Sequence, residues 1–532
     1  MDAHEWFLSA PERGNDHTAL VGRHGDAAWA PGNSVRPLVH GRVYFAELLR
    51  RLTAMRAGDL VLFTDWRGDP DERLAGDGTE VGRVLAGLAE RGVVVKGLVW
   101  RSHWDRLQFS AEENRRLEEE INAAGGECIR DMRVRLGGSH HQKFVVLRHA
   151  GRPELDVAFV GGIDLCHSRN DDAEHDGDPQ RQGMAPVYGD RPPWHDVQLE
   201  LRGPVVADLE ACFRERWDDP APVTRNPFYR IADAVRHDDD VPDPLPAQFP
   251  DPAPVGNHHV QILRTYPLRR PGYRFAPRGE YTVARGYRKA IGNARSLIYV
   301  EDQYFWADEV VGCFADALRA SAELKVIVVI PHHPDQGGRI AMPPNLVGRQ
   351  QAIEQLRRAG PDRFAVYGVE NHAGTPVYVH AKVCVVDDLW VSVGSDNFNR
   401  RSWTHDSELS CAVLDDERDE REPAAVDRFG HGARRFARDL RLELAREHLD
   451  REPGDDSDLV APDAAYEQFR AGAEALQVWH DGGRRGPRPP GRLRPYRSEP
   501  IGRWAAPWAL ALYRTVYDPD GRPLAMRRRN AF

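Results

Sequence analysis

Two histidines in this chain are each followed, two positions later, by a lysine. His141 precedes Lys143, and His380 precedes Lys382, and an apolar run follows each pair. Only five of the 72 lysines and arginines are lysines, so lysine at both places indicates a need for a compact ammonium charge. An imidazole acts as a nucleophile or a general acid–base near neutral pH, and an ammonium binds phosphate oxygens. The two pairs therefore predict phosphoryl chemistry.

This chemistry needs a local structure that turns histidine and lysine in the same direction. On a β-strand, side chains two residues apart point to the same face, so each histidine projects beside its lysine. Around the second pair, Val379, Ala381 and Val383 then face the opposite way, into a core. The sequence therefore predicts that each pair lies on an apolar β-strand and presents one imidazole and one ammonium side by side.

The surroundings of the two pairs repeat along the chain. Each pair is followed by a second apolar strand and then by a short turn, at 161–164 in the first case and at 394–397 in the second. A carboxylate follows further on in each case, first Asp196 and then Glu408. This self-similarity over roughly 200 residues indicates an internal duplication.

With these motifs in place, the chain resembles the phospholipase D superfamily. His380, Lys382 and Asp387 match the family's His-x-Lys-x4-Asp pattern, and 394–397 matches its Gly-Ser-x-Asn element. The block 298–305 is similar to the corresponding stretch of eukaryotic-type phospholipases D. The resemblance covers about residues 37–450. It implies an α/β fold of two duplicated α-β-α sandwich halves, related by pseudo-twofold symmetry, with the active site at their interface.

One position departs from the family pattern. The seventh residue after His141 is Arg148, where the family has an aspartate and where the second motif has Asp387. An odd offset on an extended strand points away from the histidine and lysine, so this position is expected to be structural. We expect Arg148 to disturb a local ion pair more than the chemistry. A degenerate first half without activity is the alternative.

The chemistry of a phosphodiester sets what the motif residues must do. The lysines Lys143 and Lys382 bind the non-bridging oxygens and neutralise the charge that repels a nucleophile. One histidine attacks phosphorus and forms a phosphohistidine, and the other protonates the leaving group and then activates water or an alcohol. The resemblance implies that His141 is the nucleophile and His380 the acid–base; from the sequence alone the reverse assignment stays open.

Each imidazole also needs a carboxylate on its other ring nitrogen, which fixes its tautomer and orientation. Alignment of the halves makes the two downstream carboxylates equivalent, so Asp196 is predicted to hold His141 and Glu408 to hold His380. Other residues are predicted to bind the substrate or to maintain the local structure. The substrate-binding set is Asn397, Ser395, Asp164, Glu301 and Gln303, and the structural set is Asp387, Gly161, Gly162 and Gly394.

No local pattern indicates a metal site. The chain has 22 histidines but no His-Glu-x-x-His and no paired Cys-x-x-Cys. His332 and His333 stand between prolines, which is more typical of a loop than of a ligand pair. Because two histidines and two lysines supply all that the reaction needs, we expect neither a metal nor a cofactor.

Composition changes along the chain suggest its division into segments. These are an N-terminal extension, a first half, a Pro/Asp-rich linker, a second half and a C-terminal extension, at 1–36, 37–236, 237–256, 257–450 and 451–532. A polar insertion at 167–193 lies between the first motif and Asp196. Such an insertion forms either a lid over a site or an ordinary surface excursion.

The C-terminal extension is basic, whereas the chain as a whole is acidic. From Arg484 to Phe532 there are twelve arginines and three acidic residues, a balance of +9 in a chain of net charge −10. Trp504, Trp508, Tyr513 and Tyr517 are interleaved with the arginines. This combination suits an anionic lipid surface. An extension that packs back over the acidic core is the alternative.

Composition also limits the environment. The six scattered cysteines are expected to be buried free thiols in a reducing compartment. The N-terminus lacks a basic and an apolar region, and no run reaches about 18 apolar residues, so neither a signal peptide nor a membrane span is predicted. We expect a cytoplasmic protein, with a peripheral place at the inner membrane face as an option; the oligomeric state is left open.

Three functions are compatible with these residues. The first is a phospholipase D-type phosphodiesterase or phosphatidyltransferase that acts on a phospholipid at a membrane surface, with water or an alcohol as acceptor; cardiolipin-synthase-like transfer is a variant of it. The second is a nuclease, which the acidic chain disfavours because polyanion binding needs a basic face, so no nucleic-acid partner is expected. The third is a non-catalytic lipid-binding relative with a degenerate first motif.

Overall fold

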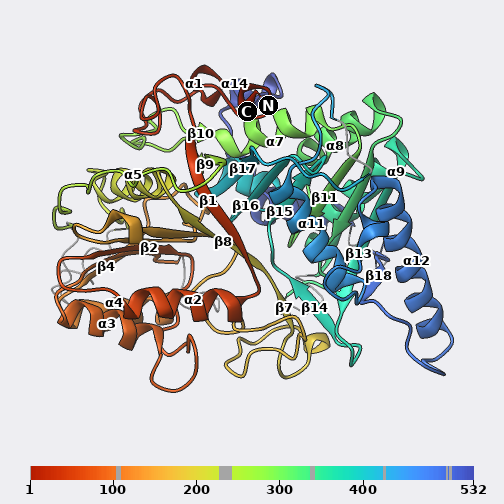
Figure 1. Ribbon diagram of the computed structural model, residues 1–532, viewed down its shortest axis with the longest axis horizontal. Coiled ribbons are helices and arrows are strands. Elements are labelled where there is room, and N and C mark those ends of the chain that lie inside the picture. Colours follow the sequence, from red (N-terminus) through yellow and green to blue (C-terminus); the bar gives the residue numbers. More distant parts are fainter. Residues whose placement is uncertain are drawn as a thin grey trace.

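The computed structural model describes residues 2–102, 110–226, 242–335, 342–422, 427–498, 501–502 and 506–532. Within these ranges the chain forms two β-sheets that lie side by side, each with helices on both faces (Figure 1). The predicted α/β fold of two duplicated sandwich halves is confirmed. The predicted end of the first half, at residue 236, falls outside the described residues, as does the beginning of the predicted linker.

The first half is built from consecutive strand–helix units. Its elements are β1 (Ala30–Val39), α2 (Gly41–Thr53), β2 (Leu60–Asp65), α3 (Val81–Glu90), β3 (Val94–Trp100), α4 (Ala111–Ala123), β4 (Glu127–Asp131), β5 (Phe144–Arg148), β6 (Val157–Gly161), β7 (Trp194–His195), β8 (Val197–Arg202) and α5 (Val205–Trp217). The strands of the sheet follow the order β4–β3–β2–β5–β6–β8–β1. Helices α2, α3 and α4 cover one face, and α5 covers the other (Figure 1).

The second half repeats this arrangement strand for strand. Its elements are β9 (His258–Tyr266), β10 (Glu280–Tyr281), α7 (Thr282–Asn293), β11 (Leu297–Glu301), α8 (Asp308–Ala320), β12 (Lys325–Val329), α9 (Met342–Ala359), β13 (Phe364–Glu370), β14 (Pro376–Val379), β15 (Val383–Val386), β16 (Trp390–Gly394), α10 (Arg400–Thr404), β17 (Glu408–Asp415) and α11 (Arg435–His448). The order β13–β12–β11–β15–β16–β17–β9 matches that of the first sheet. The internal duplication predicted from the motifs is therefore a duplication of the whole sheet.

The strands are apolar on both faces because helices cover both. Every residue of β2 (Leu-Val-Leu-Phe-Thr-Asp) and of β15 (Val-Cys-Val-Val) is buried. The helices carry apolar residues at helical spacing; in α3, Val81, Leu85 and Leu88 are buried against the first sheet. Each such side chain stabilises the fold by about 1.5–3 kcal/mol when it leaves water.

The two sheets meet at equivalent edge strands. β1 pairs with β8 from Ser34 to Val39, and its first part pairs with β9, where Ala30 lies opposite Val260 and Asn33 opposite His258. One large core of buried side chains then runs from the inner face of the first sheet to that of the second, and it includes residues of α5 and α11. The halves are consequently one packed unit, and the motif strands β5 and β15 lie on either side of it.

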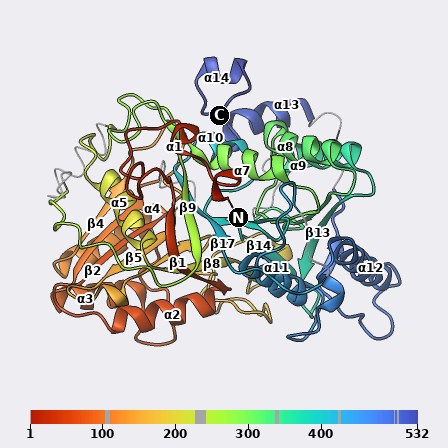
Figure 2. The ribbon, with the colours of Figure 1, turned by 45° about the horizontal axis from the view of Figure 1, so that its top comes forward.

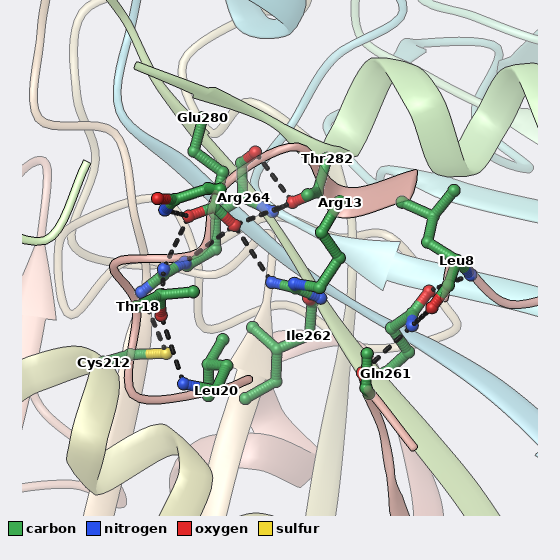
Figure 3. Close-up of polar contacts among 12 residues, drawn as sticks. Leu8, Arg13, Thr18, Leu20, Cys212, Gln261, Ile262, Arg264, Glu280 and Thr282 are labelled. Carbon is green, nitrogen blue, oxygen red and sulfur yellow. Dashed lines mark hydrogen bonds and ion pairs between the residues drawn. The ribbon is translucent and has the colours of Figure 1, made fainter. Parts of the chain in front are cut away.

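The N-terminal segment packs against the second half, although it precedes the first in sequence. The amide of Leu8 donates to Oε1 of Gln261 in β9, at 2.8 Å. The buried guanidinium of Arg13 lies 2.9 Å from Glu280, which also accepts from Arg264 at 2.7 Å (Figure 3). These contacts place residues before β1 on the opposite half, and the predicted segment boundary at 36/37 falls inside β1.

The C-terminal extension packs back onto the second half over much of its length. It contains α12 (Pro462–Asp481), β18 (Leu493–Pro495), α13 (Ala506–Leu512) and α14 (Leu524–Arg528), and β18 adds a strand to β13 (Figure 2). Arg492 lies 2.9 Å from Asp450, and Arg522 lies 3.4 Å from Glu309. These residues therefore pack back over acidic groups of the second half, as the second of the two possibilities for the extension predicted. Glu499, Arg503 and Trp504 lie outside the described residues.

Candidate active site

The two His-x-Lys motifs lie just before the strands on which they were expected. β5 begins at Phe144 and β15 at Val383, each one residue after the motif lysine. The predicted strand position is therefore wrong by a few residues. The alternation itself is present, because Val379, Ala381 and Val383 are all buried in the central core. The motif histidines and lysines therefore lie just before the first residue of each strand, at the junction of the two halves.

Each motif imidazole is held by a carboxylate of the opposite half. Nδ1 of His141 lies 2.9 Å from Oε2 of Glu408, and Nδ1 of His380 lies 2.7 Å from Oδ2 of Asp196. Both carboxylates are buried. The predicted pairing, Asp196 with His141 and Glu408 with His380, is wrong: the identities of the four residues hold, and the partners are exchanged.

The backbone explains the exchange. The amide of His141 donates to the carbonyl of Ser407 at 2.9 Å, and the amide of His380 donates to the carbonyl of His195 at 2.8 Å. Ser407 immediately precedes Glu408, and His195 immediately precedes Asp196. Each motif histidine is thus bonded through its amide to one residue of the other half and through its ring to the next. Pairing across the interface brings both motifs into one site.

The two motif lysines are buried beside the histidines. Lys143 is 1 % exposed, donates to the carbonyl of His141 at 3.0 Å and lies 3.4 Å from Oδ1 of Asp164. Lys382 is fully buried, donates to the carbonyl of His380 and lies 3.4 Å from Oε1 of Gln303. Asp164 and Gln303, both predicted to bind substrate, therefore contact the ammonium groups.

Burial and mutual repulsion of the cations set the charges of the site. Burial lowers the pKa of His141 well below its usual range, and Lys143 and Lys382 lower it further. Burial likewise lowers the pKa of His380. It lowers the pKa of Lys382 to about 8, although Asp196 acts in the opposite direction. Burial, with the charge of Asp406, raises the pKa of Glu408 to about 8. An anion between the lysines would relieve this repulsion.

Small residues make room for the carboxylates. A side chain at Gly162 would have its Cβ 2.1 Å from Oδ1 of Asp196, and one at Gly161 would lie 2.5 Å from the carbonyl of Val197. In the second half, a Cβ at Gly394 would lie 2.2 Å from Cβ of Ser410. All three predicted glycines thus stand where the chain segment carrying Asp196 or Glu408 approaches closely, which supports a structural role for them.

Two further residues that were predicted to bind substrate form hydrogen bonds within the protein. The hydroxyl of Ser395 donates to Oε2 of Glu408 at 2.5 Å, so it holds the carboxylate that holds His141. Glu301 is fully buried and lies 2.6 Å from His195, away from the motif lysines. Its alternation with Gln303 suggested a shared direction, but β11 ends at Glu301 and the chain turns before Gln303. Asn397, equivalent to Asp164, is buried at the end of β16.

The seventh motif positions are structural in both halves. The carboxylate of Asp387 accepts from the amides of Arg295, Ser296 and Leu297 at 2.8–2.9 Å, at the base of β11. Arg148, at the end of β5, contacts other charged groups of its own half. Neither side chain contacts a motif histidine or lysine through any hydrogen bond or ion pair seen within the described ranges. Arg148 therefore leaves the reacting groups in place.

Sequence reasoning missed a cation at the site. Arg169 is 3 % exposed, lies 3.6 Å from Oδ2 of Asp164 and stacks 4.0 Å above the ring of Trp194. The Trp194 ring in turn lies 5.0 Å from that of His380. Arg169 belongs to the polar insertion at 167–193, so this segment contributes side chains to the interior. Only the position of the insertion, between Asp164 and Asp196, signalled this.

The comparisons with known proteins agree with this geometry. The family model for phospholipase D matches residues 60–264, and the cardiolipin synthase, PLD-like domain matches residues 287–422. Phospholipase D alpha 1 of Cynara cardunculus is 25 % identical over 65 % of this chain, and phospholipase D A of Dictyostelium discoideum is 27 % identical over 58 %. The chain belongs to the phospholipase D superfamily.

The similarity extends over only part of each relative's length, and it includes the fold of one solved structure. The chain spans 56 % of the length of the Cynara protein and 27 % of the length of the Dictyostelium protein. Phosphatidylserine synthase of Haemophilus influenzae Rd KW20 has a similar fold, with a TM-score of 0.50 at 13 % identity, over 72 % of this chain and 82 % of that one.

Proposed function

We propose that this protein is a phospholipase D-type phosphodiesterase that cleaves or exchanges the headgroup of a phospholipid through a phosphohistidine. The observation that carries the proposal is the crossed arrangement of the motifs. It brings two imidazoles, each oriented by a carboxylate, together with two buried ammonium groups at one interface. A phosphodiester needs this set: two cations for its oxygens, one nucleophile and one acid–base.

In the first step, His141 attacks phosphorus. Its lowered pKa keeps the ring neutral, and the bond from Nδ1 to Glu408 leaves Nε2 as the free nucleophilic atom. The bound phosphate anion offsets the charge of Lys382, which helps to lower the pKa of His380 in the free site, so His380 is protonated in the complex. As the Nε2–P bond forms, the P–O bond to the leaving alcohol breaks, and that oxygen takes a proton from Nε2 of His380. Lys143 and Lys382 bind the non-bridging oxygens, where charge is concentrated throughout the reaction.

In the second step, the acceptor replaces His141. Water or an alcohol gives its proton to Nε2 of His380 as its oxygen bonds to phosphorus, and the P–Nε2 bond breaks. The product is a phosphatidic acid with water and an exchanged phospholipid with an alcohol. Since His380 is bonded to Asp196 through Nδ1, the same ring nitrogen acts in both steps, first as the acid and then as the base.

A cleft next to the segment 132–140, which precedes the first motif histidine, supports a lipid substrate. It has a volume of about 640 Å³ and adjoins the segment that leads from β4 to His141. Its lining combines four arginines with apolar side chains: Arg135, Arg225, Arg269, Arg270, Val134 and Leu136. Leu136 is 94 % exposed. Basic and apolar groups together suit a phosphate headgroup attached to acyl chains.

Transfer to a lipid alcohol is the second candidate. The match of residues 287–422 to the cardiolipin synthase, PLD-like domain favours it, because such a reaction uses the same two histidines with a different acceptor. Within the described residues, no helix has both the length and the apolar character needed to cross a bilayer. We propose peripheral contact with the membrane surface for either reaction.

The test is incubation of the purified protein with phosphatidylcholine vesicles and a primary alcohol, beside His141→Ala and His380→Ala variants. Phosphatidyl-alcohol formed by the wild type alone supports both the phosphohistidine route and the lipid substrate. Release of headgroup without phosphatidyl-alcohol would favour hydrolysis only. If neither product forms, and a nucleic acid is cleaved instead, the proposed substrate class is wrong.

A further inference from the structure

A second cluster of titratable side chains lies behind the active site. The rings of His40, His175 and His195 surround the carboxylate of Glu447, with nitrogen–oxygen distances of 2.7, 3.0 and 3.1 Å. All three histidines are at most 3 % exposed. The four potential ligand atoms lie within 4.8 Å of one another. The reaction proposed above uses none of these residues.

We propose that this cluster is a binding site for a divalent transition-metal ion of the zinc class. Imidazole nitrogens with one carboxylate oxygen form a donor set that suits zinc, and four protein ligands give the closed, tetrahedral coordination of a structural site. Ligand atoms on one zinc ion lie about 3.4 Å apart, so the widest separations in the cluster must shorten by up to about 1.4 Å around the ion, while the short contacts to Glu447 lengthen by about 0.3–0.7 Å. The proposal is independent of the reaction assigned to the catalytic histidines.

The groups around the ligands support this assignment. A metal-bound histidine commonly donates its other ring nitrogen to a carbonyl or a carboxylate, which fixes the ring. His175 has Nε2 toward Glu447 and Nδ1 3.1 Å from the carbonyl of Trp194. His195 has Nδ1 toward Glu447 and Nε2 2.6 Å from Glu301. Two of the three rings therefore already have the outer partner that a ligand needs.

Glu301 acquires a role in this arrangement. Its second oxygen, Oε1, lies 2.8 Å from Nε2 of His448 and accepts from the hydroxyl of Tyr299 at 2.5 Å. A carboxylate that is fixed by two further donors holds the His195 ring in one orientation. This explains a fully buried acidic residue that does not reach the motif lysines.

Backbone strain gives an independent sign that the rings are held for a purpose. His40 has φ 70° and ψ 156°, a conformation that is nearly restricted to glycine, and His175 has φ 57°. A non-glycine residue in such a region is strained, and it persists only where the surroundings over-determine its conformation. Both strained residues point their rings at the same carboxylate. Their ring centroids lie 4.9 Å apart, and the ring planes are inclined at 80° to each other, an edge-to-face arrangement.

An ion here would fasten segments that are far apart in sequence. His40 lies between β1 and α2, His175 lies in the polar insertion, His195 lies in β7, and Glu447 lies in α11 of the second half. Asp196, the carboxylate that holds His380, directly follows His195. The site would therefore fix β7 and the junction of the halves, while the four protein ligands leave no open position for substrate.

The test uses untagged full-length protein and measures binding rather than turnover. After treatment with a chelator, Co²⁺ is added as a spectroscopic probe, and Zn²⁺ is added in a parallel thermal melt. We expect about one ion per chain, intense tetrahedral Co²⁺ absorption bands, and a rise in Tm of about 5 °C or more with Zn²⁺. Glu447→Gln and His175→Gln should abolish the bands and the rise in Tm.

Two control variants distinguish this cluster from the other buried histidines of the chain. His149→Gln removes a different buried histidine, which lies 3.2 Å from Asp156, and it should leave Co²⁺ binding intact. His380→Ala removes a catalytic imidazole and should also leave it intact. If the wild type binds no Co²⁺ in tetrahedral form and Zn²⁺ does not change its Tm, the inference is wrong. Bands that are lost in His380→Ala but kept in Glu447→Gln would likewise overturn it. The wild-type result decides even if a cluster variant fails to fold.

Discussion

The two halves differ in the carboxylate that fixes the end of the motif strand, which is β5 in the first half and β15 in the second. In the second half the carboxylate belongs to the segment after the motif strand, and in the first half it belongs to the segment before the neighbouring strand β2. In the second half, Asp387 follows β15 and accepts from three consecutive amides at the start of β11. In the first half, Asp59 precedes β2 and accepts at 2.9 Å from the amide of Ala150, which follows β5. The start of β2 pairs with the end of β5 (Leu60 opposite Arg148), just as the start of β11 pairs with the end of β15 (Ile298 opposite Val386). The two carboxylates therefore fix equivalent ends of equivalent strand pairs. The carboxylate precedes the central strand in the first half and follows the motif strand in the second half, but in both halves it links the same two strand ends by hydrogen bonds.

This difference explains what Arg148 does. Because Asp59 supplies the link between the strand ends, the seventh motif position is free for another contact. Arg148 lies 2.9 Å from Asp156 and 2.7 Å from Glu210, all without exposure, and donates to the carbonyl of Pro250. Pro250 lies in the described part of the crossover between the halves. The first half therefore uses this position to hold the crossover.

The reacting groups, in contrast, are almost symmetric. Each histidine has a carboxylate of the other half on Nδ1, and each lysine bonds back to the carbonyl of its own motif histidine. The side chain of His141 is 15 % exposed, however, and that of His380 is 6 % exposed. Because the hydrogen-bond partners of the two histidines match, we expect the position of the bound substrate to decide which histidine is the nucleophile and which is the acid–base.

The largest predicted effect distinguishes the two histidines. His141→Ala removes the nucleophile and should lower kcat by about 10⁵-fold or more. His380→Ala removes the acid–base and should lower kcat by about 10²–10⁴-fold. Steady-state turnover of a soluble short-chain phospholipid measures both. A larger loss in His380→Ala than in His141→Ala would exchange the two roles, and equal losses would contradict the predicted difference between them.

The second prediction concerns the seventh positions. Arg148→Asp would place a third carboxylate beside two buried ones, so we expect a loss of about 3–5 kcal/mol in the free energy of unfolding. Asp387→Asn weakens three hydrogen bonds and should cost about 1–3 kcal/mol. Chemical denaturation measures both, and kcat per folded molecule should stay near that of the wild type. If Arg148→Asp raised both stability and turnover, the structural role assigned to this position would be wrong.

The smallest effect concerns pH and Lys382. Because its folded-state pKa is lowered to about 8, its ammonium charge is present below that pH and is lost above it. We expect kcat/KM to fall by up to about tenfold per pH unit above pH 8. Lys382→Arg keeps its charge in this range, so the fall should disappear while kcat/KM is lower overall. A profile that falls identically in both proteins would assign the limb to another group.

The sequence predicted the parts of this site that depend on local spacing. His141, Lys143, His380 and Lys382 follow from two short motifs, and Asp196 and Glu408 follow from the repeat of their surroundings. Their pairing could not follow, because equivalence between halves says nothing about which half each carboxylate faces. Under pseudo-twofold symmetry, the direct and the crossed pairing give the same sequence pattern. Only the packing of the halves decides between them.

Other features had no local pattern at all. The ligands proposed for the second cluster come from positions 40, 175, 195 and 447, and no short motif links positions so far apart. Ser395 and Glu301 were predicted to bind substrate, but their contacts depend on where β16 and β11 end. The fold class, by contrast, followed from the family resemblance that the two motifs and the internal duplication carry, and for this reason it could be predicted without knowing how the halves pack.

The crossed pairing can be tested through the leaving group. A p-nitrophenyl phosphodiester of a lipid releases p-nitrophenolate, which departs without a proton, so its first step does not need the acid His380. Phosphorylation of His141 then depends on Glu408 and not on Asp196. The measurement is the rapid burst of p-nitrophenolate in Asp196→Asn and in Glu408→Gln, with His380→Ala and His141→Ala as references.

We predict that Asp196→Asn keeps the burst, as His380→Ala does, and that a phosphohistidine at residue 141 can be trapped in both. Glu408→Gln should lose the burst by about 10²–10⁴-fold, because the nucleophile is no longer oriented. If Glu408→Gln keeps the burst and Asp196→Asn loses it, each carboxylate serves the histidine of its own half, and the assembly of one site across the two halves is contradicted.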